Sequence, residues 1–274
     1  MNQDSSDLSP EAAALSRIFQ SSLPDKLKLF EIHRQLGPTG GRRCVDVCLG
    51  QPMMSRQLRL AGGDWQTVVS CEEMLAPARE IVGEPVAALE GGRLPCEDGS
   101  ADLLVLGEGL ERREDDVAFV QECHRVLKSD GRLILCARHS KRTTLVRPLR
   151  RLLGVTPQRL GWAREGYSEK VLFDVLKNGF DVMQIRSYGR FLLETVDTLV
   201  RARVSSSVLP GRREVRCYRT AGLFYRLAFQ LDVLFGMTKG HHWIVVGKKR
   251  MWRTRQAPVL RDGRTITEAV LSRS

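Results

Sequence analysis

Short apolar runs alternate with helix-like segments between Cys44 and Ala137. Five runs have the length and composition of buried strands, at residues 44–48, 66–71, 85–89, 101–106 and 132–136. Apolar residues between these runs recur at helical spacing, which predicts helices at residues 55–60, 72–82 and 115–127. Strands that alternate with helices are typical of βαβ units, in which the strands lie parallel. The pattern therefore predicts an α/β domain built around a parallel sheet.

Elements on either side of this block extend the domain. Before it, Ser9 and Pro10 form an amino-terminal cap for a first helix, and Asp25 begins a second helix that ends at Gly37. After it, two further strands are predicted at residues 180–188 and 241–247. We therefore expect amino-terminal helices over residues 1–43, a sheet domain over 44–250 with a helical insertion at 190–240, and a flexible basic tail over 251–274.

The chain is strongly basic, with 43 Lys and Arg against 32 Asp and Glu and a net charge of +11. Such a balance indicates attraction to phosphates, anionic lipid or acidic glycans, and the alternative is a solvated basic surface that only aids solubility. Basic residues are densest between Arg132 and Arg164, where no acid occurs and leucines recur at helical spacing. This segment is either an amphipathic helix for an anionic membrane or phosphate-bearing substrate, or a surface helix with its leucines on the core.

The sequence contains no apolar run long enough to span a membrane, which needs about 18 residues. The most apolar late segment, residues 221–237, is interrupted by Arg226 and Asp232, which favours a core or interfacial helix. The amino terminus has no secretory signal, and the seven cysteines form no Cys-x-x-Cys pair. These features predict free thiols in a reducing compartment, no metal site, and a cytoplasmic protein with peripheral membrane contact at most.

The turn after the first predicted strand, Cys44 to Pro52 (CVDVCLGQP), is the first candidate for ligand binding. In a doubly wound α/β protein, ligands bind beyond the carboxyl ends of the strands, where the strand order reverses. Glycine is useful in such a turn because the backbone can then approach the ligand closely. Here Asp46 precedes a turn that has only one glycine, Gly50.

A second block carries a more specific pattern. A Leu-Pro pair, an acid-glycine-serine turn and an Asp open one strand, and Arg-Val-Leu-Lys with a glycine turn precedes the next. These residues are Leu94, Pro95, Asp98, Gly99, Ser100, Asp102, Arg125, Val126, Leu127, Lys128 and Gly131. In this order they resemble the class I S-adenosylmethionine-dependent methyltransferases, specifically the type 11 group, and the resemblance extends over roughly residues 25–250. It implies a doubly wound, Rossmann-like α/β fold with a seven-stranded, mostly parallel sheet and S-adenosyl-L-methionine as cofactor.

The resemblance also implies which residues bind the cofactor. Asp46 matches the acid of the family's first motif and Gly50 its middle glycine, whereas Cys48 and Pro52 stand at two positions where the family has glycine. Glu72 is the carboxylate nearest to the end of the second strand, where the family binds the ribose.

Later strand ends supply the remaining candidates. Glu90 and Gly91 match the position near the adenine, and Gly107 matches the position that lines the methyl donor. Glu108 and His139 are the candidate catalytic bases for an acceptor whose attacking atom must lose a proton. Each has an ordinary alternative, as a solvated loop carboxylate and as a packed histidine.

Three functions are compatible with these features. The first is methyl transfer to a small-molecule, lipid-linked or glycan acceptor. The second, methylation or binding of nucleic acid, is motivated by the charge but is less favoured, because leucines rather than aromatic residues interleave the basic clusters. The third is a non-catalytic partner protein that keeps the fold without binding cofactor, motivated by Cys48, by Pro52 and by the missing ribose-binding acid, since Glu72 comes one or two positions late. The oligomeric state stays open.

Overall fold

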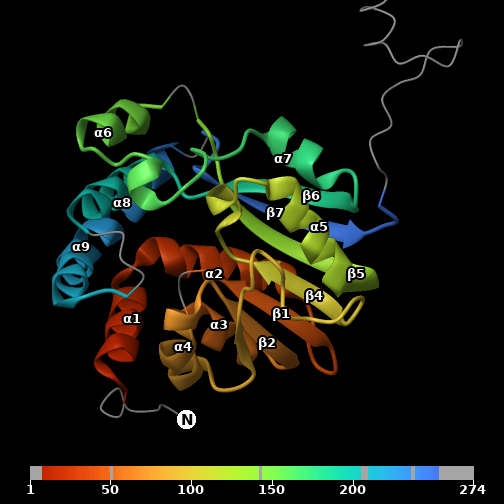
Figure 1. The fold of residues 1–274 in the computed structure, drawn as a ribbon. Coiled ribbons are helices and arrows are strands. Elements are labelled where there is room, and N and C mark those ends of the chain that lie inside the picture. Colours follow the sequence, from red (N-terminus) through yellow and green to blue (C-terminus); the bar gives the residue numbers. More distant parts are fainter. Residues whose placement is uncertain (1–7, 50–51, 142–143, 205–208, 236–237, 253–274) are drawn as a thin grey trace, which may run out of the picture.

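The computed structural model describes residues 8–49, 52–141, 144–204, 209–235 and 238–252. Within these residues one seven-stranded sheet has the order β3-β2-β1-β4-β5-β7-β6 (Figure 1). The strands are β1 (Arg43–Cys48), β2 (Asp64–Val69), β3 (Val86–Ala88), β4 (Ala101–Leu106), β5 (Leu127–Arg138), β6 (Phe180–Tyr188) and β7 (His242–Lys249). β1 pairs in parallel with β2 and β4, whereas β7 is antiparallel to β5 and β6. The predicted doubly wound α/β fold is confirmed, and its strand order reverses between β1 and β4.

Helices cover both faces of the sheet because side chains alternate along each central strand. Along β4, Leu103 and Val105 face one helical layer while Leu104 and Leu106 face the other. The first layer contains α1 (Pro10–Ser21), α2 (Leu23–Leu36), α3 (Pro52–Arg59) and α4 (Leu75–Val82). The second contains α5 (Asp116–Val126) and α7 (Glu169–Leu176). The sheet is thus buried on both sides, and the edge at which doubly wound sheets bind ligands lies at the carboxyl ends of β1 and β4.

The segment between β6 and β7 is helical. It comprises α8 (Phe191–Arg203), α9 (Arg212–Leu231) and the short 3-10 turn η4 (Asp232–Phe235). Leu193 and Val200 of α8 pack on Ala221 and Tyr225 of α9, and both helices lie at one side of the molecule, near α1 (Figure 1). This layer stands beside the carboxyl edge of the sheet.

Several element boundaries differ from the sequence prediction. β2 covers Asp64–Val69, so it begins and ends two residues earlier than expected. β5 begins at Leu127, because Leu127 pairs with Ala101 and an irregularity in the register absorbs the Asp130–Gly131 turn. The predicted basic helix is only α6 (Val146–Leu152), and its leucines are divided: Leu145 is 75 % and Leu152 84 % exposed, whereas Leu149 and Leu153 are half-buried. The rest of the predicted tail, from residue 253, lies outside the described residues.

None of the seven cysteines, all of which lie in the described part of the chain, forms a disulfide. Cys44, Cys48, Cys123 and Cys136 are buried in the sheet or in the helix packed on it. They contribute to the core as small apolar side chains.

Candidate functional site

The reversal of strand order brings the loop after β1 next to the turn after β4. Gly109 has φ +101°, and a Cβ added there would collide with the buried side chain of Leu49. A Cβ at Gly107 would lie 3.4 Å from Met54 Sδ of α3 and 3.9 Å from Ile32 Cδ1 of α2. The chain at this edge is therefore closely packed, and α2 and α3 both reach the predicted methyl-donor position. Gly50 of the first motif lies outside the described residues.

Asp46 is buried beneath α3 rather than exposed at the sheet edge. It stands within β1, paired with Thr67 and Val105, and is only 4 % exposed. Within the described part of the chain, its Oδ2 atom has no hydrogen-bond partner. Burial raises the pKa of the Asp46 carboxyl to about 6, although Ser55 and Arg59 on α3 act in the opposite direction.

The raised pKa predicts a pH-dependent effect of Asp46→Asn on stability. The native state holds the proton more tightly than the unfolded chain, so wild-type stability falls as the pH rises from 3.8 to about 6. We expect Asp46→Asn to gain roughly 2 kcal/mol over wild type at neutral pH and little near pH 4. Urea unfolding at both pH values measures this, with exposed Asp64→Asn as control. An equal effect at both pH values would contradict it.

The ends of β2 and β3 place two carboxylates in solvent. Glu72 begins the 3-10 turn η1 (Glu72–Met74) three residues beyond Val69, the paired end of β2, and it is exposed. Glu90 and Gly91 follow β3 in a tight turn, where Glu90 bridges to Arg93 and Gly91 has φ +54°. Both carboxylates therefore stand at the edge where the sequence predicts the nucleoside half of the cofactor. Cys48 is buried at the end of β1.

Glu108, the first candidate base, is paired with a lysine of α2. Lys28 Nζ lies 3.0 Å from Glu108 Oε2 and 3.6 Å from Asp25 Oδ1. Burial alone would raise the pKa of Glu108, but Lys28 and Arg112 reverse this and lower it to about 2. The pair fixes α2 over the mouth of β4, and Glu108 is ionised at neutral pH.

His139, the second candidate base, lies in a different cavity from Glu108. Its Nδ1 is 2.8 Å from the Gly240 carbonyl oxygen, its ring lies against Trp243, and burial lowers its pKa. It lines an open groove of about 1140 Å³ that extends to Phe191 and Lys239. The two candidate bases are therefore not brought together.

A small cavity beside Glu108 joins the ends of β4, β5 and β7. It holds about 50 Å³, and its lining includes Lys28, Gly107, Glu108, Arg138, Trp162 and Tyr188. Glu111 closes its floor, because its buried carboxylate accepts from the backbone N–H groups of Gly109 at 3.2 Å and Arg138 at 2.5 Å. The guanidinium of Arg138 stacks on Trp162, with 4.4 Å from its carbon to the ring centre. This cavity lies next to the strand-order reversal, at the turn after β4.

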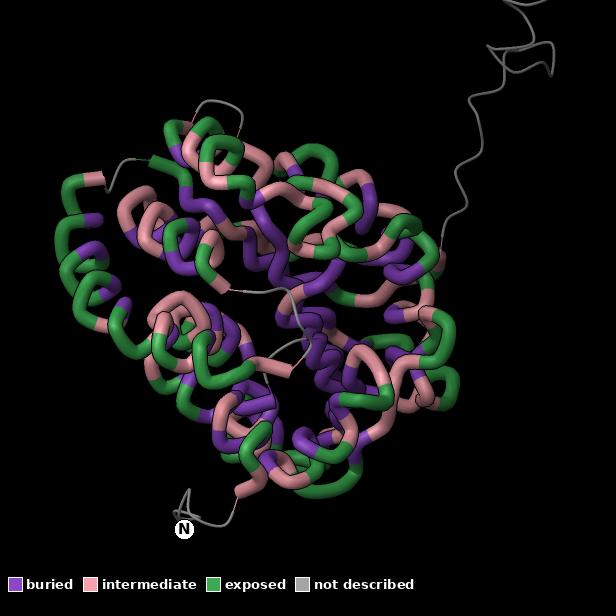
Figure 2. The backbone as a smooth tube through the Cα atoms, turned by 60° about the vertical axis from the view of Figure 1, so that its left-hand side comes forward, coloured by how far each residue is buried: buried purple, intermediate pink, exposed green. Residues whose placement is uncertain are grey.

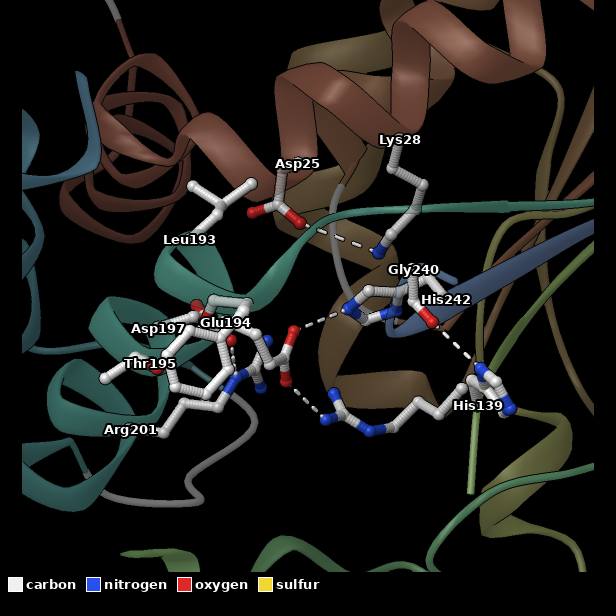
Figure 3. A network of polar contacts seen from close by, with 12 residues as sticks. Asp25, Lys28, His139, Leu193, Glu194, Thr195, Asp197, Arg201, Gly240 and His242 are labelled. Atoms are coloured by element: carbon white, nitrogen blue, oxygen red, sulfur yellow. Dashed lines mark hydrogen bonds and ion pairs between the residues drawn. The ribbon is translucent and has the colours of Figure 1, made fainter. Parts of the chain in front are cut away.

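Behind the cavity, Glu194 of α8 is the centre of a buried ionic cluster (Figure 3). Its Oε1 accepts hydrogen bonds from the guanidinium groups of Arg138, at 2.7 Å, and of Arg150 on α6. Its Oε2 lies 2.9 Å from His242 Nε2. Burial alone would raise the pKa of Glu194, but Arg138 and Arg150 hold it well below its usual value. Sequence reasoning missed Arg138 and Glu194 as site residues and treated His242 as an ordinary strand residue. The cluster connects α6 and α8 to the ends of β5 and β7.

A metal-binding group is not found among the described residues, where no set of three His, Cys, Asp or Glu side chains converges. In the same part of the chain, no helix combines the length and the apolar character needed to cross a bilayer.

The part of the chain that forms this edge of the sheet is similar to a known protein family. The sequence model of the family described as "Methyltransferase domain" matches residues 45–135, which run from β1 into β5. Residues 45–135 are therefore similar to a methyltransferase domain, over about a third of the chain. This domain contains the strand-order reversal and the positions of Asp46, Glu72, Glu90 and Glu108.

Curated relatives of the methyltransferase domain have low identity and partial overlap. A demethylmenaquinone methyltransferase from Corynebacterium kroppenstedtii is 30% identical over 105 residues, 38% of this chain and 44% of that protein. A ubiquinone/menaquinone biosynthesis C-methyltransferase from Geotalea uraniireducens is 26% identical over 152 residues, 52% of this chain and 64% of that protein. The chain thus spans about half the length of the curated relatives it matches.

Solved structures match more of the chain. An S-adenosylmethionine-dependent methyltransferase from Thermotoga maritima has a TM-score of 0.53 at 18% identity, covering 86% of this chain and 94% of that one. Another from Archaeoglobus fulgidus has a TM-score of 0.51 at 14% identity, covering 82% and 94%. At these identities the likeness concerns the fold.

Proposed function

We propose that this protein transfers a methyl group from S-adenosylmethionine to a small-molecule acceptor. The observation that carries the proposal is the pair of exposed carboxylates, Glu72 and Glu90, at the ends of β2 and β3 beside the strand-order reversal. Ligands of doubly wound sheets bind at this edge. The matched methyltransferase domain and relatives that act on quinone precursors support the same chemistry.

The residues present fit the nucleoside half of the cofactor. A carboxylate such as Glu72 accepts hydrogen bonds from ribose hydroxyls, and Glu90 lies one strand further along the same edge. S-adenosylmethionine supplies an activated methyl group on a sulfonium. The chain's own contribution is to align acceptor and donor at the turn after β4 and to exclude water there.

The role of Glu108 follows from its pairing with Lys28. A general base works best when its pKa lies near the working pH, and the pKa of Glu108 is lowered to about 2. We therefore assign Glu108 to orienting the acceptor as a hydrogen-bond acceptor at the turn after β4, beside the small cavity that it shares with Arg138 and Trp162. An acceptor whose neutral hydroxyl or amine group donates to Glu108 suits this position, because an anionic oxygen would be repelled by the ionised carboxylate.

A second candidate function is a non-catalytic partner protein with the same fold. It is favoured by Leu49, Met54 and Ile32, which pack against the glycines after β4, and by Lys28, which ties α2 over them. In that case the edge of the sheet would not admit the methionine half of the cofactor.

Calorimetric titration of S-adenosylmethionine and S-adenosylhomocysteine distinguishes the two functions. We expect the wild type to bind both, and Glu72→Gln to bind roughly tenfold more weakly because a charge-assisted hydrogen bond is lost. Glu73→Gln is the matched control, since Glu73 is the exposed neighbour on the same turn, and it should bind like the wild type. No binding of either ligand by the wild type at millimolar concentration would reject methyl transfer in favour of the partner protein.

A further inference from the structure

The end of α9 and the following η4 form an exposed apolar surface. Its members are 47–79 % exposed, and they are Leu223, Phe224, Leu227, Phe229, Leu231, Val233 and Leu234. Figure 2 shows α9 along the left-hand margin, with buried residues turned inward and exposed residues outward. So many large apolar side chains on one short segment are unusual for a surface that faces only water.

Helical geometry divides α9 into a buried stripe and an outward face. Ala221, Tyr225 and Ala228 are buried at spacings of four and three residues, against α8. Leu223 and Leu227 stand on the opposite side of the helix, and Leu231, four residues further on, lies between that side and the buried stripe. These leucines are 47–64 % exposed within the described chain.

The amino-terminal half of the same outward face is basic. Arg212, Arg213, Arg216 and Arg219 are exposed, and Arg226 stands among the leucines. The two acids of α9 and η4, Glu214 and Asp232, are buried instead. Asp232 accepts from the backbone N–H groups of Leu192 and Leu193 at 2.7 and 2.9 Å. The exposed surface thus carries arginines and apolar side chains without a described acidic residue to offset them.

We propose that α9 and η4 dock this protein on the surface of an anionic lipid bilayer. The apolar side chains at residues 223–234 enter the headgroup boundary, and the arginines contact lipid phosphates, as in interfacial helices. The absence of exposed acids favours this occupant over a second copy of the chain, whose identical arginines would face one another in a symmetric contact. The proposal is independent of cofactor binding.

Vesicle co-sedimentation tests the proposal with the full chain. Wild type should bind vesicles of equal parts phosphatidylcholine and phosphatidylglycerol, and bind phosphatidylcholine alone at least tenfold more weakly. The variant Leu223→Ser/Leu227→Ser/Leu234→Ser should lose at least tenfold of its affinity for the mixed vesicles. Leu60→Ser, which removes a leucine that is 73 % exposed at the end of α3, is the control and should bind normally.

Two further measurements test whether α6, or self-association of the protein, accounts for the result instead of α9. Leu145→Ser/Leu152→Ser tests the exposed leucines of α6, and loss of binding in this variant alone would overturn the assignment to α9. Sedimentation velocity tests self-association: a wild-type dimer that the triple variant dissociates, with no vesicle binding, would also overturn it. Circular dichroism should show an unchanged fold for every variant, since the replaced side chains are exposed.

Discussion

Glu194→Ala is expected to lower the free energy of unfolding by about 3–5 kcal/mol, because it removes the common partner of a buried ionic cluster. Glu194 is 4 % exposed and holds Arg138, Arg150 and His242. Without it, the guanidinium groups of Arg138 and Arg150 remain in the protein interior without the carboxylate that pairs with both. Loss of the cluster should also loosen α8 from the ends of β5 and β7.

Urea unfolding followed by circular dichroism measures this effect. The control is Glu169→Ala, which breaks an exposed ion pair with Lys239 and should cost under about 1 kcal/mol. Glu194 has a pKa lowered in the native state, so its contribution is present above pH 4.5 and is lost as the pH falls further. The difference between Glu194→Ala and wild type should therefore shrink in acid. A loss no larger than that of Glu169→Ala would contradict the role of the cluster.

The sheet could be predicted because its signals are local. Apolar runs such as residues 101–106 and helical periodicity such as residues 115–127 are each visible within a short window, and their alternation implies the βαβ topology. The exact first and last residues of the strands could not be predicted as well. The continuation of β5 back to Leu127 depends on pairing with Ala101, which lies on a different strand.

The residues of the candidate site, like the strands, could be predicted only in part from the sequence. Asp46, Glu72 and Glu108 could be found because each lies within or just after a predicted strand. Their surroundings could not: the lysine that pairs with Glu108 is 80 residues away, on α2. Arg138 and Glu194 are separated by 56 residues, and neither stands in a recognisable motif. Tertiary contact alone reveals that they form one cluster.

The structure also separates the two halves of the predicted active site. Side chains of β5 alternate between the two faces, so Arg138 reaches the α8 side while the adjacent His139 packs on Trp243. His139 therefore lines the large groove and Glu108 the small cavity. Residues that are neighbours in the sequence, such as Arg138 and His139, can therefore face different cavities. Sequence position alone does not show which side chain could accept a proton in the proposed reaction.

Gly240→Ala is expected to lower the free energy of unfolding by about 3 kcal/mol or more, because the main chains of two strands approach too closely there for a side chain. A Cβ on Gly240 would lie 2.6 Å from the backbone nitrogen of Tyr188 and overlap its carbonyl group. Backbone atoms cannot rotate away, so the start of β7 must move from the end of β6. The Gly240 carbonyl oxygen also holds His139 Nδ1 at 2.8 Å, and β7 carries His242 to Glu194.

The matched control for this substitution is Gly222→Ala. Gly222 lies within α9, and an added Cβ would meet no atom within 4 Å. Alanine is the better helix former there, so Gly222→Ala should stabilise the protein by about 0.5–1 kcal/mol. Thermal unfolding of both variants compares a main-chain collision with a simple gain in helix propensity. If Gly240→Ala unfolded at the wild-type temperature, β6 and β7 would not approach as closely as the structure shows. The connection between the ionic cluster and the edge of the sheet, which depends on this close approach, would then be rejected.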